Sequence, residues 1–274
     1  MIIDAHTHVY PEKIVERAIA KLEAASGVPA KVNGLKSGLQ LSMKEAGIDY
    51  SLLLPVATSV KQVDAINEEA AQTNDTAGET GLLSFGGIHP DTENYKEVLS
   101  KASRSGLRGI KLHPDYQNTF FNDIKYKRIV EKASELGLYL MVHCGEDIGL
   151  PDPIHCRPEH IREVLSETGS DKLILAHMGG WRMWDEVEEL LAGQNVYMDT
   201  AFSFDCMPGV EGMLTKEQFV LLVRRHGADR IVFGTDSPWA GQKEYVEWIN
   251  ETTLTQEEKE KIFSGNMRRI LDMD

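Results

Sequence analysis

The chain begins Met1-Ile2-Ile3-Asp4-Ala5-His6-Thr7-His8, a short apolar run that ends in two histidines separated by one residue. Side chains two positions apart on a β-strand point to the same side, so both imidazoles can face one metal ion. Alone, such a pair is equally compatible with two buried histidines in a core. It gains weight because His143, His177 and Asp236 also follow short apolar runs.

Short β-rich runs of this kind recur along the whole chain and alternate with helical patterns. They cover residues 2–5, 50–56, 82–88, 109–112, 138–142, 172–176, 195–198 and 230–233. Several are apolar without interruption, as in Leu173-Ile174-Leu175-Ala176, which is typical of parallel strands buried on both faces. Helical spacing of apolar residues occupies intervals such as 12–25, 124–136 and 216–226, and a capping-box signature at Thr255 and Glu258 opens a closing helix toward Leu271.

This alternation fits either a (β/α)8 barrel or a doubly wound open sheet. An open sheet gathers ligands at one switch point, whereas a barrel brings every strand end to one mouth. Ligand-type side chains follow most of the predicted strands, at His6/His8, His89, Lys111/His113, His143, His177 and Thr235/Asp236. We therefore predict the α/β class and one TIM barrel domain over residues 1–274, a length close to the ~250 residues that a barrel typically needs.

Composition restricts the partners and the compartment. The net charge of −14 argues against nucleic acid and anionic membranes, because phosphate binding relies on clustered Lys and Arg. No apolar run approaches the ~18 residues of a membrane span, and no signal peptide precedes the first strand. The three cysteines form no disulfide framework, so we expect a cytoplasmic protein that acts on a small molecule. A homo-oligomer is compatible with the sequence, although nothing locates an interface.

Asp236 lies in Gly234-Thr235-Asp236-Ser237-Pro238 and has two interpretations. A carboxylate beside a metal-bound water can accept its proton, which makes Asp236 a ligand, a general base or both. Alternatively, it is the N-cap of a helix that begins near Pro238. Its position after the last predicted strand favours catalysis.

The set His6-Thr7-His8, His143, Ala176-His177-Met178-Gly179-Gly180 and Gly234-Thr235-Asp236 resembles the amidohydrolase superfamily. Within it, the chain is similar to the amidohydrolase-related (amidohydrolase 2) group of metal-dependent barrels, which includes hydrolases and aromatic-acid decarboxylases. The resemblance extends from residue 3 to the last predicted helix. It implies that His6 and His8 bind the more buried metal and that His143 is a further ligand. His177 would bind a second metal or polarise substrate or water, and Asp236 would contact the metal and move the proton.

One or two divalent ions are therefore expected. Zn²⁺ is the default for histidine and carboxylate ligands that leave a position open to water. Mn²⁺ and Fe²⁺ also suit these ligands.

The predicted fourth strand departs from the decarboxylase branch of the group, because it reads Gly109-Ile110-Lys111-Leu112-His113-Pro114. Many relatives in that branch lack a lysine there, whereas dihydroorotase-like members carry one that is carbamylated and bridges two metals. The resemblance thus implies a carbamate bridge at Lys111. The alternatives are an ammonium that binds a substrate carboxylate and a lysine extended along the barrel rim.

Loops after the strands set specificity in such barrels. We expect substrate contacts from His113, Arg157, Arg182 and Trp239. The arginines are equally compatible with an ordinary surface position, and His113, which precedes a proline, with a structural cap.

The function expected first is a metal-dependent hydrolase. A metal-activated water would attack an amide, ester or lactone bond of a small acidic substrate, Asp236 would carry the proton, and His177 would help to stabilise the oxyanion. The alternative is a non-oxidative decarboxylase in which one metal holds an aromatic or unsaturated acid and Asp236 or His177 protonates carbon. Lys111 favours the hydrolase. The full ligand set argues against a barrel without catalysis, and the negative charge argues against a deoxyribonuclease.

Overall fold

Short parallel strands form the wall of a barrel in the computed structural model, which describes residues 1–273. They are β1 (Ile3–Thr7), β2 (Tyr50–Leu53), β3 (Leu82–Ser84), β4 (Gly86–Gly87), β5 (Gly109–Leu112), β6 (Tyr139–Val142), β7 (Leu173–Leu175), β8 (Tyr197–Asp199) and β9 (Ile231–Val232). The strands pair in the order β1-β2-β3 and β4-β5-β6-β7-β8-β9. Only Phe85 separates β3, which pairs with β2, from β4, which pairs with β5. The predicted run 82–88 is therefore one position of the wall, divided into two strands.

Contacts between the first and last strands close the barrel. The Ala5 N–H donates to the Phe233 carbonyl at 2.7 Å, and Thr7 pairs in parallel with Ser237. The eight predicted runs thus occupy the eight positions of a (β/α)8 TIM barrel, as expected, and the strands end several residues earlier than some runs predicted.

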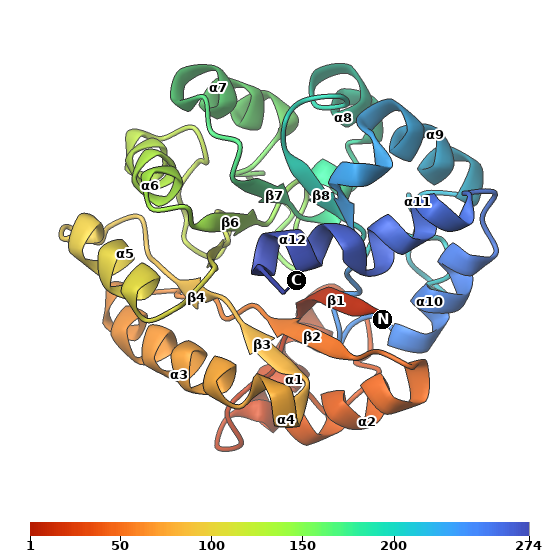
Figure 1. The fold of residues 1–274 in the computed structure, drawn as a ribbon, viewed down its shortest axis with the longest axis horizontal. Helices are drawn as coiled ribbons and strands as arrows, with labels where there is room; N and C mark the ends of the chain where they lie inside the picture. Colours follow the sequence, from red (N-terminus) through yellow and green to blue (C-terminus); the bar gives the residue numbers. More distant parts are fainter. Residues whose placement is uncertain (274) are drawn as a thin grey trace.

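Helices surround this wall on the outside, as Figure 1 shows in a view along the barrel. They are α1 (Val15–Ser26), α2 (Lys36–Ala46), α3 (Val63–Asp75), α4 (Ala77–Thr80), α5 (Tyr95–Arg104), α6 (Ile124–Glu135), α7 (Pro158–Thr168), α8 (Trp184–Leu190), α9 (Lys216–His226), α10 (Gln242–Asn250), α11 (Gln256–Glu260) and α12 (Asn266–Leu271). Three-residue 3₁₀ turns lie at Val60–Gln62, His177–Gly179 and Ala228–Arg230.

The closing helix differs from the sequence prediction. The capping box at Thr255 and Glu258 is present, but a π-helical turn, Lys261–Gly265, separates α11 from α12. The Ile262 carbonyl accepts the Phe233 N–H at 2.9 Å. This bond joins the widened turn to the residue after β9.

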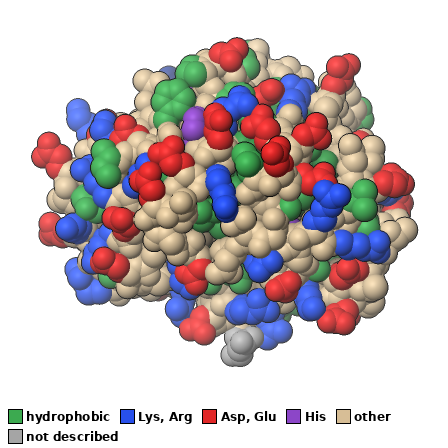
Figure 2. All heavy atoms as spheres, turned by 90° about the horizontal axis from the view of Figure 1, so that it is seen from above, with side chains coloured by type: hydrophobic (Ala, Val, Ile, Leu, Met, Phe, Trp, Pro, Cys, Tyr) green, Lys and Arg blue, Asp and Glu red, His purple; other side chains and the backbone are tan. Residues whose placement is uncertain are grey.

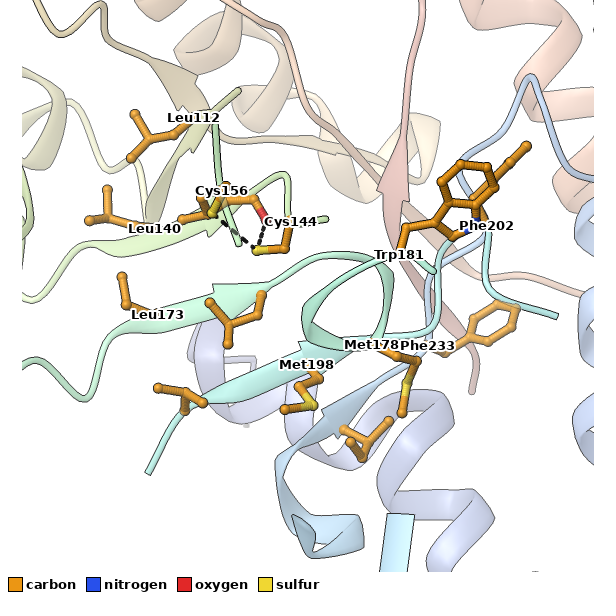
Figure 3. Close-up of a cluster of buried hydrophobic side chains, with 14 of the residues drawn as sticks. Leu112, Leu140, Cys144, Cys156, Leu173, Met178, Trp181, Met198, Phe202 and Phe233 are labelled. Carbon is orange, nitrogen blue, oxygen red and sulfur yellow. Dashed lines mark hydrogen bonds between the residues drawn. The ribbon is translucent and has the colours of Figure 1, made fainter. Parts of the chain in front are cut away.

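Two hydrophobic cores fix the geometry of the mouth. The larger lies between strands and helices, and Figure 3 shows the part around Leu112, Leu140 and Leu173. The smaller fills the barrel interior, where residues of α12 pack beneath inward-facing strand residues. In Figure 1, α12 crosses the centre of the barrel. One end of the barrel is thereby plugged, and the carboxyl ends of the strands remain available for a site.

The face shown in Figure 2 carries acidic and basic side chains interspersed, with hydrophobic side chains scattered among them. Among the described residues, no helix combines the length and the apolar character that a membrane span requires.

Candidate metal centre and substrate cavity

Three side chains, two from the beginning of the chain and one from the turn after the last strand, meet at the mouth of the barrel. Nε2 of His6 and Nε2 of His8 lie 3.1 Å apart, and Asp236 Oδ1 lies 3.3 Å from the first and 3.1 Å from the second. Ligand atoms held at about 2.1 Å from one ion, at right or tetrahedral angles, lie about 3.0 to 3.4 Å from one another. The three atoms therefore have the spacing of ligands that share one divalent ion.

Hydrogen bonds behind the imidazoles fix which nitrogen carries the proton. His6 Nδ1 donates to Asp199 Oδ2 at 2.6 Å, and His8 Nδ1 donates to the Leu54 carbonyl at 3.0 Å. Each neutral ring then has its lone pair on Nε2, and the two lone pairs face one another. A cation stabilises this arrangement, and a carboxylate behind a metal-binding histidine is the usual support of such a ligand.

The charges around this group keep Asp236 ionised. Burial raises the pKa of the Asp236 carboxyl, but its close contacts with the imidazoles of His8 and His6 outweigh burial and bring the pKa to about 2. Burial lowers the pKa of His6 well below its usual value, and the nearby Lys111 charge lowers it further. The alternative role of Asp236 as an N-cap is wrong, because α10 begins at Gln242 and its N-cap is Gly241.

His143 and His177 lie beside this group without joining it. His177 Nδ1 donates to the Ala201 carbonyl at 2.9 Å, and His177 Nε2 lies 2.9 Å from His143 Nδ1. The ring centroids of His6 and His177 are 5.3 Å apart. The two side chains are thus available to substrate or to an ion next to the three-atom group.

A second group with metal-ligand composition consists of His113, Asp115 and His143. In this group the rings of His113 and His143 are stacked, with centroids 4.1 Å apart and planes inclined by 7°. Two parallel rings at this separation cannot direct their in-plane lone pairs to one ion, so the group lacks the geometry of a metal site. Asp115 instead accepts from His155 Nδ1 at 3.0 Å.

Lys111 projects from β5 into the same region and is buried. Its Nζ lies 3.2 Å from His6 Nε2. Burial lowers the pKa of Lys111 to about 8, against the opposing effects of Asp199 and Asp236.

A cavity of about 1040 Å³ contains these residues. This volume lies just above the ~300–1,000 Å³ usual for small-molecule sites. Aromatic side chains contribute to its walls: Tyr10, Tyr116, Trp181, Phe202 and Trp239. Tyr116 stacks on His113 with ring centroids 3.9 Å apart.

The residues predicted to contact substrate divide into two pairs. His113 and Trp239 line the cavity, whereas Arg157 and Arg182 are not among its described lining residues. The Arg157 guanidinium donates to Glu186 at 2.7 Å. The Arg182 guanidinium lies 4.1 Å from the centre of the Trp181 ring and donates to the Glu211 carbonyl at 3.0 Å. Arg157 is engaged away from the cavity, whereas Arg182 lies against Trp181 and Glu146, which line it. Substrate contacts of the two arginines therefore stay a prediction.

Two buried carboxylates that the sequence analysis did not assign support the centre. Asp199 ends β8, and besides His6 its Oδ1 accepts the N–H groups of His177 and Ala201. Asp4 accepts from the Thr235 hydroxyl at 2.6 Å and from Gln242 at 2.8 Å, which ties β1 to the turn that carries Asp236. The sequence did contain a signal for both residues, since Asp199 ends a strand and Asp4 lies inside an apolar run.

The backbone at the mouth is left-handed at several residues other than glycine. The φ angles are 72° at Asp236, 57° at His177, 52° at Met178 and 48° at Phe202. Such conformations cost of order 1–3 kcal/mol each and persist where surrounding contacts hold them. Here the Asp236 N–H donates to the His6 carbonyl at 2.8 Å.

Comparison with known proteins gives one family and several relatives. A model of the family described as amidohydrolase matches residues 3–273. Gamma-resorcylate decarboxylase of Rhizobium radiobacter is 26% identical over 113 residues, which is 37% of this chain and 34% of that enzyme. The matched stretch thus spans about a third of that relative's length.

Solved structures resemble the whole chain. The 5-carboxyvanillate decarboxylase of Sphingomonas paucimobilis matches with a TM-score of 0.71 and 16% identity over 99% of this chain and 98% of that one. A dihydroxybenzoic acid decarboxylase of Polaromonas sp. JS666, with bound manganese and the inhibitor 2-nitroresorcinol, matches with a TM-score of 0.69 and 17% identity over 99% and 97%. At these identities the likeness establishes the TIM-barrel fold.

These comparisons contradict the prediction of a hydrolase, because the relatives named above are decarboxylases of aromatic acids. Lys111 was therefore a misleading guide to the reaction. A divalent metal is supported by the ligand group and by the manganese of the Polaromonas enzyme, while zinc as the preferred ion is not confirmed.

Proposed function

The chain belongs to the amidohydrolase family, whose model covers residues 3–273, and from this premise we propose that it is a metal-dependent, non-oxidative decarboxylase of a small aromatic or unsaturated carboxylic acid. The observation that carries the proposal is the convergence of His6, His8 and Asp236 within a cavity that has aromatic walls. Relatives that act on resorcylate, carboxyvanillate and dihydroxybenzoate favour an acid with a hydroxyl group on its ring.

We assign His6, His8 and Asp236 as ligands of one divalent ion, with His143 and His177 beside them. When bound, the ion supplies positive charge that holds the carboxylate and an adjacent oxygen of the substrate. Manganese is the first ion to test because a structural relative contains it, and zinc is the second because it suits the same ligands.

Asp236 is the residue that we expect to move the proton. Its pKa of about 2 means that the carboxylate is ionised at neutral pH, so it must accept a proton before it can donate one. Of the described residues, none bonds to Asp236 Oδ2, which leaves this oxygen free to take the proton of the substrate hydroxyl.

Asp236 then gives this proton to the ring carbon that carries the carboxylate. The bond between that carbon and the carboxylate breaks, its electron pair returns to the ring, and CO₂ leaves. The product departs as a phenolate that regains its proton from solvent. His177, fixed by Ala201 and His143, is suited to orient the substrate beside Asp236. The aromatic walls limit access of water to the charged intermediate.

The direct test is to incubate the Mn²⁺-loaded protein in D₂O with a panel of ortho-hydroxybenzoic acids. We expect CO₂ release together with one deuterium at the carbon that lost the carboxylate. Asp236→Asn should abolish both signals while it keeps the fold, and Asp75→Asn, at an exposed position on α3, is the matched control. Absence of CO₂ release from every acid in the panel by metal-loaded protein would refute the proposal.

A further inference from the structure

Lys111 is a buried cation without an anionic partner. Its exposed fraction is 1%, and of the described residues only His6 offers Nζ a hydrogen-bond acceptor, at 3.2 Å. No carboxylate oxygen of the described residues lies within 4.0 Å of this ammonium. An ammonium has three N–H donors, and its burial is costly unless an anion or several acceptors compensate.

Metal binding would remove the one acceptor that Lys111 has. The lone pair on His6 Nε2 faces His8 and Asp236 as well as Nζ, because His6 Nδ1 carries the proton that it donates to Asp199. An imidazole nitrogen that is bound to an ion cannot also accept a hydrogen bond. The ammonium would then lie beside a second positive charge, and an anion in the cavity would compensate both.

The charges nearest to the centre agree with this requirement. An ammonium at Lys111, carboxylates at Asp199 and Asp236, and imidazoles whose Nδ1 atoms carry the ring protons give the group one negative charge before an ion binds. A divalent ion changes this to one positive charge, which a single carboxylate neutralises. Carbamylation of Lys111 beside a single divalent ion would leave one negative charge, which repels an acidic substrate, and only a second ion would restore a positive centre.

We propose that the Lys111 ammonium is a substrate-binding group that holds an anionic oxygen of a carboxylic acid next to the metal centre. The assignment of that acid as the compound to be decarboxylated rests on the proposed function. The subsite itself needs only that the cavity accepts a planar carboxylate, with Lys111 at its inner end and the stacked pair Tyr116 and His113 among its walls.

The experiment compares two probes that differ in charge, salicylate and its neutral amide salicylamide. Their affinities are measured by titration calorimetry on Mn²⁺-loaded protein, and NMR establishes that neither probe has reacted. Lys111→Met should weaken salicylate binding by roughly 10- to 100-fold, the range for a hydrogen bond to a charged group, and should leave salicylamide binding unchanged. Lys111→Arg keeps the charge and should keep the preference for salicylate.

Lys61→Met is the matched control, because Lys61 lines the same cavity but is exposed. Metal content and melting temperature are recorded for every variant, and Lys111→Gln replaces Lys111→Met if the latter does not fold. An unchanged preference for salicylate in the folded, metal-loaded variant would overturn the proposal. So would a bicarbonate-dependent mass increase of the wild type equal to one CO₂, lost together with metal in Lys111→Met, since it identifies a carbamate bridge. Because binding is measured without turnover, failure of the decarboxylase assay leaves this test intact.

Discussion

Asp199→Asn should weaken Mn²⁺ binding while the barrel stays folded. Asp199 Oδ1 accepts the N–H groups of His177 at 2.8 Å and Ala201 at 3.0 Å, and Oδ2 accepts from His6 Nδ1 at 2.6 Å. An asparagine keeps both backbone bonds only if its carbonyl takes the place of Oδ1. Its NH₂ group then faces His6 Nδ1 as a donor.

This donor would shift the tautomer of His6. The ring would accept at Nδ1 and carry its proton on Nε2, the nitrogen whose lone pair faces His8 and Asp236. Loss of such a supporting carboxylate typically costs 10- to 100-fold in metal affinity. That range corresponds to about 1.4–2.7 kcal/mol, at about 1.36 kcal/mol for each factor of ten.

The assay is titration of Mn²⁺ into metal-free protein, followed by the loss of the free-ion signal in electron paramagnetic resonance. Circular dichroism establishes that the variant is folded, and Asp75→Asn serves as an exposed control. If folded Asp199→Asn bound Mn²⁺ as tightly as the wild type, the argument from the His6 tautomer would be wrong.

Three further outcomes follow from the structure. Burial lowers the pKa of His226, so the folded state resists protonation and the free energy of unfolding should fall as the pH drops below about 6.5. Between about pH 7.5 and pH 5.5, the free energy of unfolding in urea should fall less for His226→Gln than for the wild type, and an equal fall would contradict this. Gly145→Ala should lower the melting temperature by several degrees, because φ is 87° and the added methyl would overlap the Trp181 backbone. Calorimetry tests this, with Gly106→Ala, whose added methyl meets open space, as the control. Excess Mn²⁺ at about 100 times its dissociation constant should stabilise the wild type by about 2.7 kcal/mol relative to EDTA, and Asp236→Asn should show much less of this shift in a thermal melt.

The fold was predictable because each strand and its end can be recognised from a few consecutive residues. An uninterrupted run such as Leu173-Ile174-Leu175-Ala176 specifies a strand buried on both faces, and the following His177 marks its exit. The same argument located His6, His8 and Asp236. It did not separate hydrolysis from decarboxylation, because both reactions use these ligands at the same strand ends.

Features that depend on distant partners were not predictable. Arg157 is held by Glu186, on another helix, and sequence alone does not pair them. The orientation of His143 depends on contacts with His113 and His177, which come from other strand ends. Asp199 was not assigned a role, because its hydrogen bond to His6 joins β8 to β1, which are far apart in the sequence.

The left-handed backbone at the mouth has a consequence for how this enzyme can change over generations. At position 236 a glycine would relax φ without strain, whereas aspartate is held there by its neighbours. Without metal, selection for heat tolerance alone should therefore enrich Asp236→Gly, and selection for turnover should remove it. A library that is selected for heat tolerance without metal and without a requirement for activity would accumulate stable barrels that no longer bind metal, so the two traits have to be screened together.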